Sequence, residues 1–425
     1  MEITIDKLAS GGSGLGFHEG MAIFVPNTAP GDVVEVEIKS KRKRHAHAEL
    51  VKIITPSPKR TEPLCPVYEQ CGGCQLQHLD APTRNDYKAA VVKEALEHIA
   101  KFENPPMQPL LPGEPETQYR RRCGLKIRWV RDHAVVGFFQ TATKRIVDLP
   151  GCPVLHPTLE KMIEPIRQLV GKLSVRERLP QVDLSCGDEG LGMIIHVLRK
   201  LSAKDKEILQ NFAEENKIDQ VWIQWGRRDD LIAFIDNEPM RYSPDGEATL
   251  KFMPGDFTQA HFEQNRQLVD LVLEWVGKGE RVLDLFSGIG NFTLPLARQF
   301  KRATGYESYE PAVKRGRSNT MAHPSVTFKT VDLFDETALK GLPLADVDAL
   351  VVDPPRDGAA NLAKQIHADG GPETIVWVSC DPATFARDAL ILCSGGYQLE
   401  KVKPLDMFPM TSHVELIARF TKTGA

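Results

Sequence analysis

Apolar and polar residues alternate through the first 54 residues of this 425-residue chain. A period of two is the pattern of a β-strand with one buried face, and it recurs in EITIDKL, AIFVP, DVVEVEIKS and HAELVKII. The segments SGGSGLG and NTAPGD lie between these stretches and are rich in turn-forming residues. About five short strands in so short a region predict a closed barrel of the OB kind over residues 1–55, a fold that often binds nucleic acid.

The pattern changes after the predicted barrel. The proline-rich segment TPSPKRTEPLCP indicates a linker. Apolar residues then recur at helical spacing from 83 to 102, which predicts an amphipathic helix. Residues 119–252 are mixed and strand-rich, with one helical stretch, AKDKEILQNFAEENK. We therefore assign residues 56–252 to a mixed central domain and expect its helix at 83–102 to pack on the domain that follows.

The strands after residue 252 are almost entirely apolar. RVLDLF, RATGYE, DALVVD and TIVWVS alternate with helical patterns. Strands of this kind are buried on both faces, so the alternation predicts a doubly wound parallel sheet. The fold class is thus α/β, with a Rossmann-like domain at 253–425 that follows the barrel and the central domain.

Composition places the chain among ordinary soluble proteins, because 42% of its residues are hydrophobic and 26% are charged. The amino end, MEITIDKLAS, lacks the basic and apolar regions of a signal peptide. No apolar run reaches the ~18–20 residues that a membrane span requires. We interpret the chain as cytoplasmic, without membrane contact, and expect a monomer.

The net charge of −4 conceals a surplus of basic residues in the first third of the chain. Two basic clusters stand out there, KSKRKRHAH and YRRRC. Either cluster alone is explained by a solvated loop. Two clusters in one part of an acidic protein favour a polyanionic partner, because phosphate contacts supply most of the affinity for nucleic acid.

Eight cysteines in a reducing compartment indicate metal binding or catalysis rather than disulfides. CPVYEQCGGC places Cys65, Cys71 and Cys74 in one loop, and Cys152 in PGCPVLH is the best candidate for a fourth ligand. Four thiolates suit zinc or an iron–sulfur cluster. A trio with one distant cysteine favours a [4Fe–4S] cluster, with zinc and no metal as alternatives. Three others are interpreted as buried apolar residues: Cys123, Cys186 and Cys393.

RVLDLFSGIGNFTLPLA has the pattern of a strand, a glycine turn and the start of a helix. Gly288 and Gly290 let the backbone approach a ligand, and the helix start offers free N–H groups. The third glycine of the dinucleotide fingerprint is missing. Asp284 at the strand end would repel a pyrophosphate but can hold an amino group. The segment therefore favours S-adenosylmethionine over NAD.

Two further acids follow successive strands. Glu307, in GYE, lies about 20 residues past the glycines, where it can accept hydrogen bonds from ribose hydroxyls. Asp332, in FKTVDLF, can face the adenine end. Each acid alone is explained by a solvated loop. Together with Asp284, they predict a cofactor site at the carboxyl edge of the sheet.

Residues that could take part in a reaction follow the next two predicted strands. VVDPPRDG has Arg356 where enzymes that methylate exocyclic amines need an aromatic residue, which argues for a different attack. Methylation of uracil C5 requires a thiolate that adds to C6 and a base that removes the C5 proton. Cys380 in TIVWVSCDPATFARD and Glu415 in MTSHVELIARF can fill these roles, with His413 expected on the strand face of Glu415. The alternatives are core packing for the thiol and an exposed strand position for the acid.

These motifs resemble a known family. GSGLGFHEGMAIFVPNTAPGD resembles a TRAM domain. CPVYEQCGGCQLQH, DLFSGIGNFTLPLA, DPPR, SCDPATFARD and DMFPMTSHVE resemble, in order, the RNA uracil-5 methyltransferases. The chain is most similar to the branch with both a TRAM domain and a [4Fe–4S] cluster, which methylates 23S ribosomal RNA. The bacterial transfer-RNA branch lacks both modules.

The resemblance implies that Cys380 is the nucleophile and Glu415 the base. It makes Cys65, Cys71, Cys74 and Cys152 the cluster ligands and places Phe257 near the target base. It also implies a pocket for S-adenosylmethionine formed by Gln259, Phe286, Asn291, Glu307, Asp332 and Asp353.

Four positions depart from the residues common in the family: Ser287, Asp381, Met410 and His261. Asp381 adds a charge beside Cys380 that is expected to raise the pKa of the thiol. These departures leave the RNA target open. A 23S ribosomal RNA uridine leads, with a transfer RNA uridine as the alternative and a non-catalytic RNA-binding protein as a hypothesis of another class.

Overall fold

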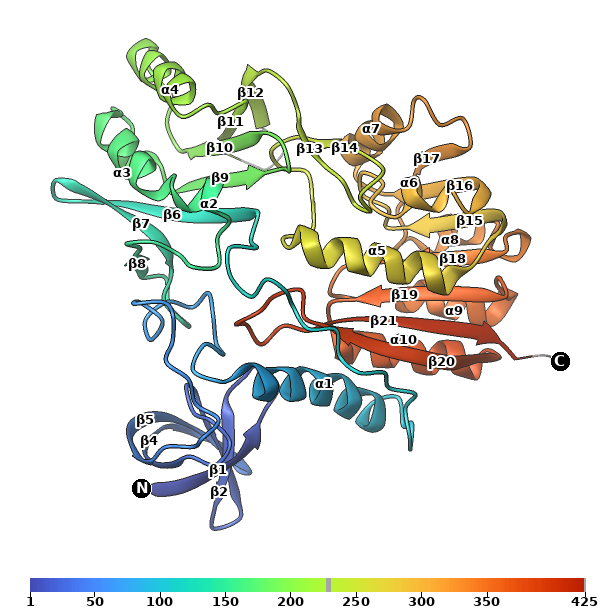
Figure 1. Cartoon of the computed structure of the whole chain (residues 1–425), viewed down its shortest axis with the longest axis horizontal. Helices are drawn as coiled ribbons and strands as arrows, with labels where there is room; N and C mark the ends of the chain where they lie inside the picture. The colour runs from blue at the N-terminus through green and yellow to red at the C-terminus, as the bar shows by residue number, and fades with distance from the viewer. Residues whose placement is uncertain (227–230, 424–425) are drawn as a thin grey trace.

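The computed structural model describes residues 1–226 and 231–423. The chain forms three parts: a small barrel at the lower left of Figure 1, a sheet with helices at the upper left, and an α/β unit on the right. No helix within these described ranges is long and apolar enough to cross a membrane.

The amino-terminal part is a closed five-stranded barrel with strand order β1-β2-β3-β5-β4. Its strands are β1 (Glu2–Leu8), β2 (Gly14–His18), β3 (Met21–Val25), β4 (Val33–Lys41) and β5 (His45–Thr55). The alternation seen in the sequence puts Ile3, Ile5 and Val34 inside, where each is less than 5% exposed. The predicted closed barrel is therefore confirmed.

The central part is a seven-stranded sheet with order β12-β11-β10-β9-β6-β7-β8. Its strands are β6 (Arg122–Val130), β7 (His133–Phe139), β8 (Ile146–Asp148), β9 (Gln181–Cys186), β10 (Leu191–Val197), β11 (Gln220–Trp225) and β12 (Leu231–Asp236). Its helices are α2 (Pro157–Glu160), α3 (Ile163–Lys172), η1 (Arg176–Arg178) and α4 (Ala203–Glu215).

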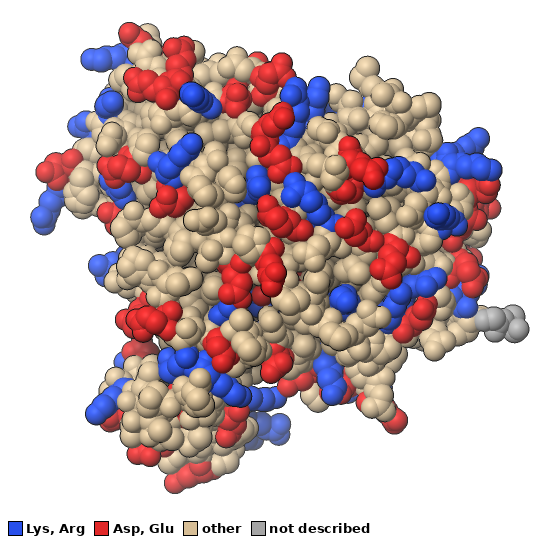
Figure 2. Space-filling model, in the orientation of Figure 1, with Lys and Arg blue, Asp and Glu red and all other residues tan. Residues whose placement is uncertain are grey.

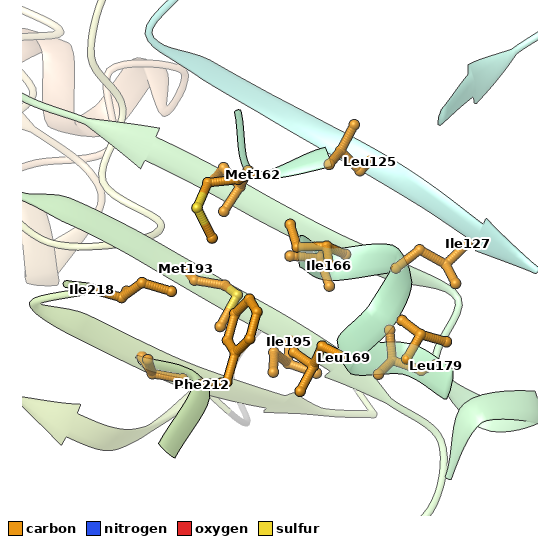
Figure 3. Close-up of a cluster of buried hydrophobic side chains, with 14 of the residues drawn as sticks. Leu125, Ile127, Met162, Ile166, Leu169, Leu179, Met193, Ile195, Phe212 and Ile218 are labelled. Atoms are coloured by element: carbon orange, nitrogen blue, oxygen red, sulfur yellow. The ribbon is translucent and has the colours of Figure 1, made fainter. Parts of the chain in front are cut away.

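Helices α3 and α4 close the core of the central part. Ile166 of α3 and Phe212 of α4 pack on Met193 and Ile195 of β10 (Figure 3). Helix α4 begins where it does because Ser202 and Asp205 form a capping box, in which each side chain accepts a hydrogen bond from the other residue's main-chain N–H.

The carboxyl-terminal part contains a second seven-stranded sheet, ordered β17-β16-β15-β18-β19-β21-β20. Its strands are β15 (Gly279–Leu285), β16 (Phe300–Glu307), β17 (Val326–Thr330), β18 (Ala349–Val352), β19 (Thr374–Ser379), β20 (Tyr397–Leu405) and β21 (Glu415–Lys422). Helical elements alternate with the strands: α5 (Phe262–Val276), α6 (Thr293–Leu296), α7 (Glu310–Asn319), α8 (Glu336–Lys340), η2 (Leu344–Asp346), α9 (Ala360–Asp369) and α10 (Pro382–Ser394).

The expected parallel doubly wound sheet is confirmed for β15 to β19. The last two strands reverse, because β21 runs antiparallel to β19 and β20 runs antiparallel to β21. A separate pair, β13 (Met240–Tyr242) and β14 (Leu250–Phe252), packs against Phe262 and Ile289 of this carboxyl-terminal part.

The helix expected at 83–102 is observed as α1 (Ala81–His98), which lies along α10 and β20 (Figure 1). Val92 and Leu96 of α1 are fully buried in the same core as Leu392 of α10. Residues 106–111 then run beside β20 and extend the sheet, since Leu111 N donates to Pro404 O at 2.9 Å. The chain before the central sheet thus packs on the carboxyl-terminal part.

Lys88 of α1 is wholly buried and pairs with Asp406, which follows β20. Its Nζ also donates to Phe408 O at 3.0 Å. Burial lowers the pKa of Lys88, and the charge of Asp406 opposes that shift. The pair therefore holds α1 and the segment after β20 together without contact with water.

We expect Lys88→Met to lower the free energy of unfolding by about 3–5 kcal/mol, because Asp406 would be left as a buried charge without its partner. Urea denaturation measures the change. Lys93→Met is the matched control, since its exposed pair with Glu97 on the same helix is worth about 0.3–0.5 kcal/mol. Equal effects of the two substitutions would contradict the role of the buried pair.

Candidate active site at the carboxyl edge of the second sheet

The turn after β15 brings the backbone close to the carboxyl edge of the sheet. Phe286, Gly288 and Gly290 all have positive φ, at 64°, 53° and 105°. A Cβ at Gly290 would lie 3.0 Å from the ring of Phe328, so the position needs glycine both for its backbone and for space. Ser287 N donates to Tyr306 O at 3.0 Å and attaches the turn to β16.

Asp284, at the end of β15, is fully buried. One carboxyl oxygen accepts a hydrogen bond from Thr293 Oγ1, while within the described ranges the other, Oδ1, has no hydrogen-bond partner. Burial raises the pKa of Asp284 to about 7, and the nearby charge of Asp353 adds to the rise. Burial likewise raises the pKa of Asp353, after β18, to about 7. This edge would therefore be stabilised by a cationic ligand.

Glu307 ends β16 beside the glycine turn. Its carboxylate accepts hydrogen bonds from Gly288 N at 3.2 Å and from Tyr309 N at 2.8 Å. Asp332 lies two residues beyond β17, is exposed and accepts from Phe334 N at 2.9 Å. The Phe334 ring lies 5.7 Å from that of Phe286. The sheet topology thus brings Glu307 to the turn, whereas Asp332 closes a turn further along the edge.

Asn291 is held by side chains that the sequence reasoning missed. Its Oδ1 accepts from Tyr242 OH at 3.1 Å, and it exchanges two 2.9 Å hydrogen bonds with Asn265 of α5. Gln259 is buried in the segment before α5, with 7% of its surface exposed. Neither Tyr242 nor Asn265 belongs to a local motif, so only their partners in the fold indicate their role.

Cys380 and Glu415 lie near each other because β21 runs antiparallel to β19. Cys380 follows β19, and Glu415 is the first residue of β21. Ser379 pairs with Leu416 across the two strands, which puts the thiol and the carboxyl at neighbouring positions of one edge. His413, expected on the strand face of Glu415, instead is an exposed residue of the loop before the strand, so that expectation was wrong.

The buried surroundings of Cys380 and Glu415 raise the pKa values of both groups. Burial raises the pKa of Cys380 to about 12, with further rises from the charges of Glu415 and Asp353. Burial also raises the pKa of Glu415 to about 8, Asp353 adds to that rise, and Arg356 opposes it. The carboxylate of Asp381 caps α10 by accepting from Ala383 N and Thr384 N at 3.0 and 2.9 Å. It is not among the main causes of the shift at Cys380.

The four cysteines of the predicted metal site line one cavity of about 350 Å³. All eight cysteines of the chain are free. Gly73 N donates to Cys71 Sγ at 3.4 Å, and the main-chain amides of Val154 and Leu155 favour the anionic form of Cys152. Burial nevertheless raises the pKa of Cys74 to about 12 and that of Cys152 to about 11. Thiols in such a site are deprotonated when they bind a metal.

The described cysteine cavity is not arranged as a site for one metal ion. In the ranges that the structure describes, no three His, Cys, Asp or Glu side chains come together closely enough to hold one metal ion. Four thiolates around zinc would each lie about 2.3 Å from the ion. N–H donors to sulfur and a roomy thiol-lined cavity are features that fit an iron–sulfur cluster.

A groove of about 320 Å³ separates the central sheet from the segment before α5. Phe257 lines it with 63% of its surface exposed, and the Arg122 guanidinium lies 4.8 Å from its ring centre. The other basic cluster, KSKRKRHAH, spans the end of β4 and the start of β5, and its residues 41–44 are exposed. On the face shown in Figure 2, basic side chains are interspersed with acidic ones.

Two family descriptions match different parts of the chain. Residues 86–422 match the family described as tRNA (Uracil-5-)-methyltransferase. Residues 1–59 match the TRAM domain of tRNA (uracil(54)-C(5))-methyltransferase.

Relatives named 23S rRNA (uracil(1939)-C(5))-methyltransferase RlmD match over almost the full length. The protein of Nitrosospira multiformis is 35% identical over 99% of this chain and 98% of its own. That of Shewanella woodyi is 34% identical over 99% and 95%. The crystal structure of Pyrococcus abyssi tRNA (uracil-54, C5)-methyltransferase in complex with S-adenosyl-L-homocysteine is also similar. It covers 99% of this chain and 100% of its own at 28% identity, with a TM-score of 0.76. The chain therefore belongs to the S-adenosylmethionine-dependent RNA uracil-5 methyltransferases, with a TRAM domain at its amino end.

Proposed function

We propose that this enzyme methylates C5 of a uridine in 23S ribosomal RNA, at the position that its RlmD relatives are named for. The observation that carries the reaction is the convergence of Cys380, Glu415 and Asp353 at one edge of the sheet. Full-length matches to enzymes named for 23S rRNA support the target. A transfer RNA uridine is the second candidate, because the similar Pyrococcus abyssi enzyme shares the architecture and is named for tRNA.

Cys380 acts as the nucleophile in this proposal. The thiol gives up its proton to solvent when the substrate binds, its sulfur forms a bond to C6 of the uracil, and the electron pair of the C5–C6 double bond moves toward C5 and O4. Burial and the charges of Glu415 and Asp353 raise the pKa of Cys380, which favours the neutral thiol in the free protein. Phe257, exposed in the groove, would stack on the extruded base or on its neighbour.

Glu415 acts as the base. After methyl transfer it takes the proton from C5, the C5–C6 double bond re-forms, and the bond from C6 to Cys380 breaks to release the thiolate. A base works best when its pKa lies near the working pH, and burial brings the pKa of Glu415 to about 8. Its position beside Cys380 supports a shared binding site for the uracil ring.

S-adenosylmethionine supplies the methyl group as an electrophile when bound. The chain's own contribution is a set of oxygen atoms on the carboxyl edge. The unpartnered oxygen of Asp284 fits an amino group, and Glu307 lies where it can hold ribose hydroxyls. The resemblance adds Gln259, Phe286, Asn291, Asp332 and Asp353 to this proposed pocket. The burial of Asp284 and Asp353 favours a cation there over a pyrophosphate.

Cys65, Cys71, Cys74 and Cys152 would hold a [4Fe–4S] cluster. The wide cavity, the amide donors near sulfur and the shared position of the four thiols support this ligand set. With four protein ligands the cluster would have no open iron, so we assign it a structural role.

The covalent step tests reaction and target together. Glu415→Gln should accumulate a covalent adduct with a 23S rRNA fragment, because the C5 proton can no longer leave, while Cys380→Ala forms none. Turnover should fall by at least about 100-fold in both variants. Denaturing gels with labelled RNA measure the adduct, and a tRNA transcript is the comparison. Normal turnover by Glu415→Gln would contradict the role of Glu415 as the base. An adduct that forms only with tRNA would indicate tRNA, and not 23S rRNA, as the target.

The buried Glu415 should make stability depend on pH. Its pKa rises from an ordinary value of 4.5 to about 8 on folding. The neutral form is favoured in the folded state, so this contribution is complete below about pH 4.5 and is lost as the pH rises through about 8. Glu415→Gln should therefore raise Tm by several degrees at pH 9 and little at pH 5. Thermal melts check this, with the exposed Glu373→Gln as control, and equal shifts at both pH values would refute it.

The cysteine site should contain iron. Protein purified without oxygen should hold about four iron atoms and absorb visible light as thiolate-ligated clusters do. Cys71→Ser should lower both the iron content and the visible absorbance. Cys393→Ser, outside the site, should change neither quantity. Stoichiometric zinc without iron would contradict the iron–sulfur cluster and indicate a zinc site.

A further inference from the structure

The loop between β20 and β21 determines where Glu415 lies. This segment, residues 406–414, ends directly at Glu415, the first residue of β21. Within it, Met410 has a φ of +68°, in the left-handed region that an ordinary side chain rarely occupies. Such a conformation persists only when surrounding contacts hold it. The loop therefore depends on its neighbours for its shape.

The residues that contact the 406–414 loop belong to the cysteine loop, which contains Cys65, Cys71 and Cys74. Met410 O accepts hydrogen bonds from Gln75 N and Leu76 N, both at 3.0 Å. Ser412 N donates to Gln75 Oε1 at 3.3 Å. Gln75 Nε2 in turn donates to Gly72 O at 2.8 Å, between Cys71 and Cys74. One glutamine side chain thus connects the cysteine loop to the loop that leads into Glu415.

Packing reinforces these hydrogen bonds. Met410 is 4% exposed and packs with Tyr119 and Val154, with Cys74 and Cys152 against the same cluster. The hydroxyl of Tyr119 donates to Pro409 O at 3.0 Å. The left-handed residue is therefore covered by the same side chains that line the cysteine cavity.

The barrel closes over the same contact. A Cβ added to Gly12, in the turn after β1, would meet Leu76 Cδ2 at 2.9 Å and Ser412 Cβ at 3.2 Å. The barrel turn, the cysteine loop and the loop before Glu415 therefore meet at one point.

The two ends of the 406–414 loop are held separately. Lys88 of α1 binds Asp406 and Phe408 O at the beginning. The bonds from Gln75 and Leu76 hold Met410 and Ser412, which lie nearer to Glu415. Since Ser412 is three residues before Glu415, a displacement at this end of the loop reaches the carboxyl directly.

We propose that Gln75 is a positioning residue for Glu415, acting through the left-handed Met410 and through Ser412. The inference rests on the proposed role of Glu415 as the base. Gln75 does not contact Cys380 or the cofactor edge in any described interaction. Its loss should therefore slow removal of the C5 proton while leaving addition of the thiolate intact.

The test compares Gln75→Ala with Gln70→Ala, whose exposed side chain lies in the same loop. Full-length variants are assayed with S-adenosylmethionine and a 23S rRNA fragment. Gln75→Ala should lower turnover on the order of tenfold to a hundredfold, the scale expected when a catalytic group is displaced by about 1 Å. The fraction of enzyme trapped as covalent RNA adduct should rise, and hydrogen exchange at residues 408–416 should become faster. Gln70→Ala should resemble wild type in all three.

Unchanged turnover in Gln75→Ala would overturn the proposal. A parallel loss of turnover and adduct would overturn it too, because thiolate addition or RNA binding would then be impaired. If Glu415→Gln traps no adduct, the proposed base itself fails. In that case hydrogen exchange at residues 408–416 tests the contact by itself. Unchanged exchange in Gln75→Ala would overturn the proposed contact between Gln75 and the 406–414 loop, and faster exchange would support it as a structural contact.

Discussion

The antiparallel pairing of β21 with β19 is the constraint on which the candidate site depends. Parallel strands present their carboxyl ends at one edge, and β15, β16, β18 and β19 bring Asp284, Glu307, Asp353 and Cys380 there. A parallel β21 would carry Glu415 to the opposite edge. Because β21 reverses, its first residue lies beside the last residue of β19. The proposed base and the proposed nucleophile can therefore belong to one site.

Bringing acids together at a buried edge is unfavourable for their charged forms. Burial raises the pKa values of Asp284 and Asp353 to about 7 and that of Glu415 to about 8, and the charge of Asp353 adds to the rises at Asp284 and Glu415. A sulfonium and an amino group would relieve this repulsion, so the same electrostatics that weaken the free protein favour binding of a cationic methyl donor. The neutral thiol of Cys380 results from the same surroundings.

The cysteine loop and the barrel are connected to this edge through one short segment. Residues 406–414 contact α1 through Lys88, the cysteine loop through Gln75 and the barrel turn at Gly12. The barrel and the cysteine loop therefore also support the segment that leads into Glu415. This arrangement gives a physical reason for three modules to occur in one chain.

Local pattern determined much of this protein. Alternation predicted the barrel, and apolar strands between helices predicted the second sheet. CPVYEQCGGC predicted a metal site, and its candidate ligands line one cavity. The sequence could not decide the direction of β21, the place of His413 or the partners of Asn291 and Gln75. Those depend on contacts between residues far apart in the chain: Ser379 with Leu416, Asn291 with Asn265, and Gln75 with Ser412. Periodicity reports only which face of an element is buried, whereas pairing and loop shape follow from the packing of the whole chain.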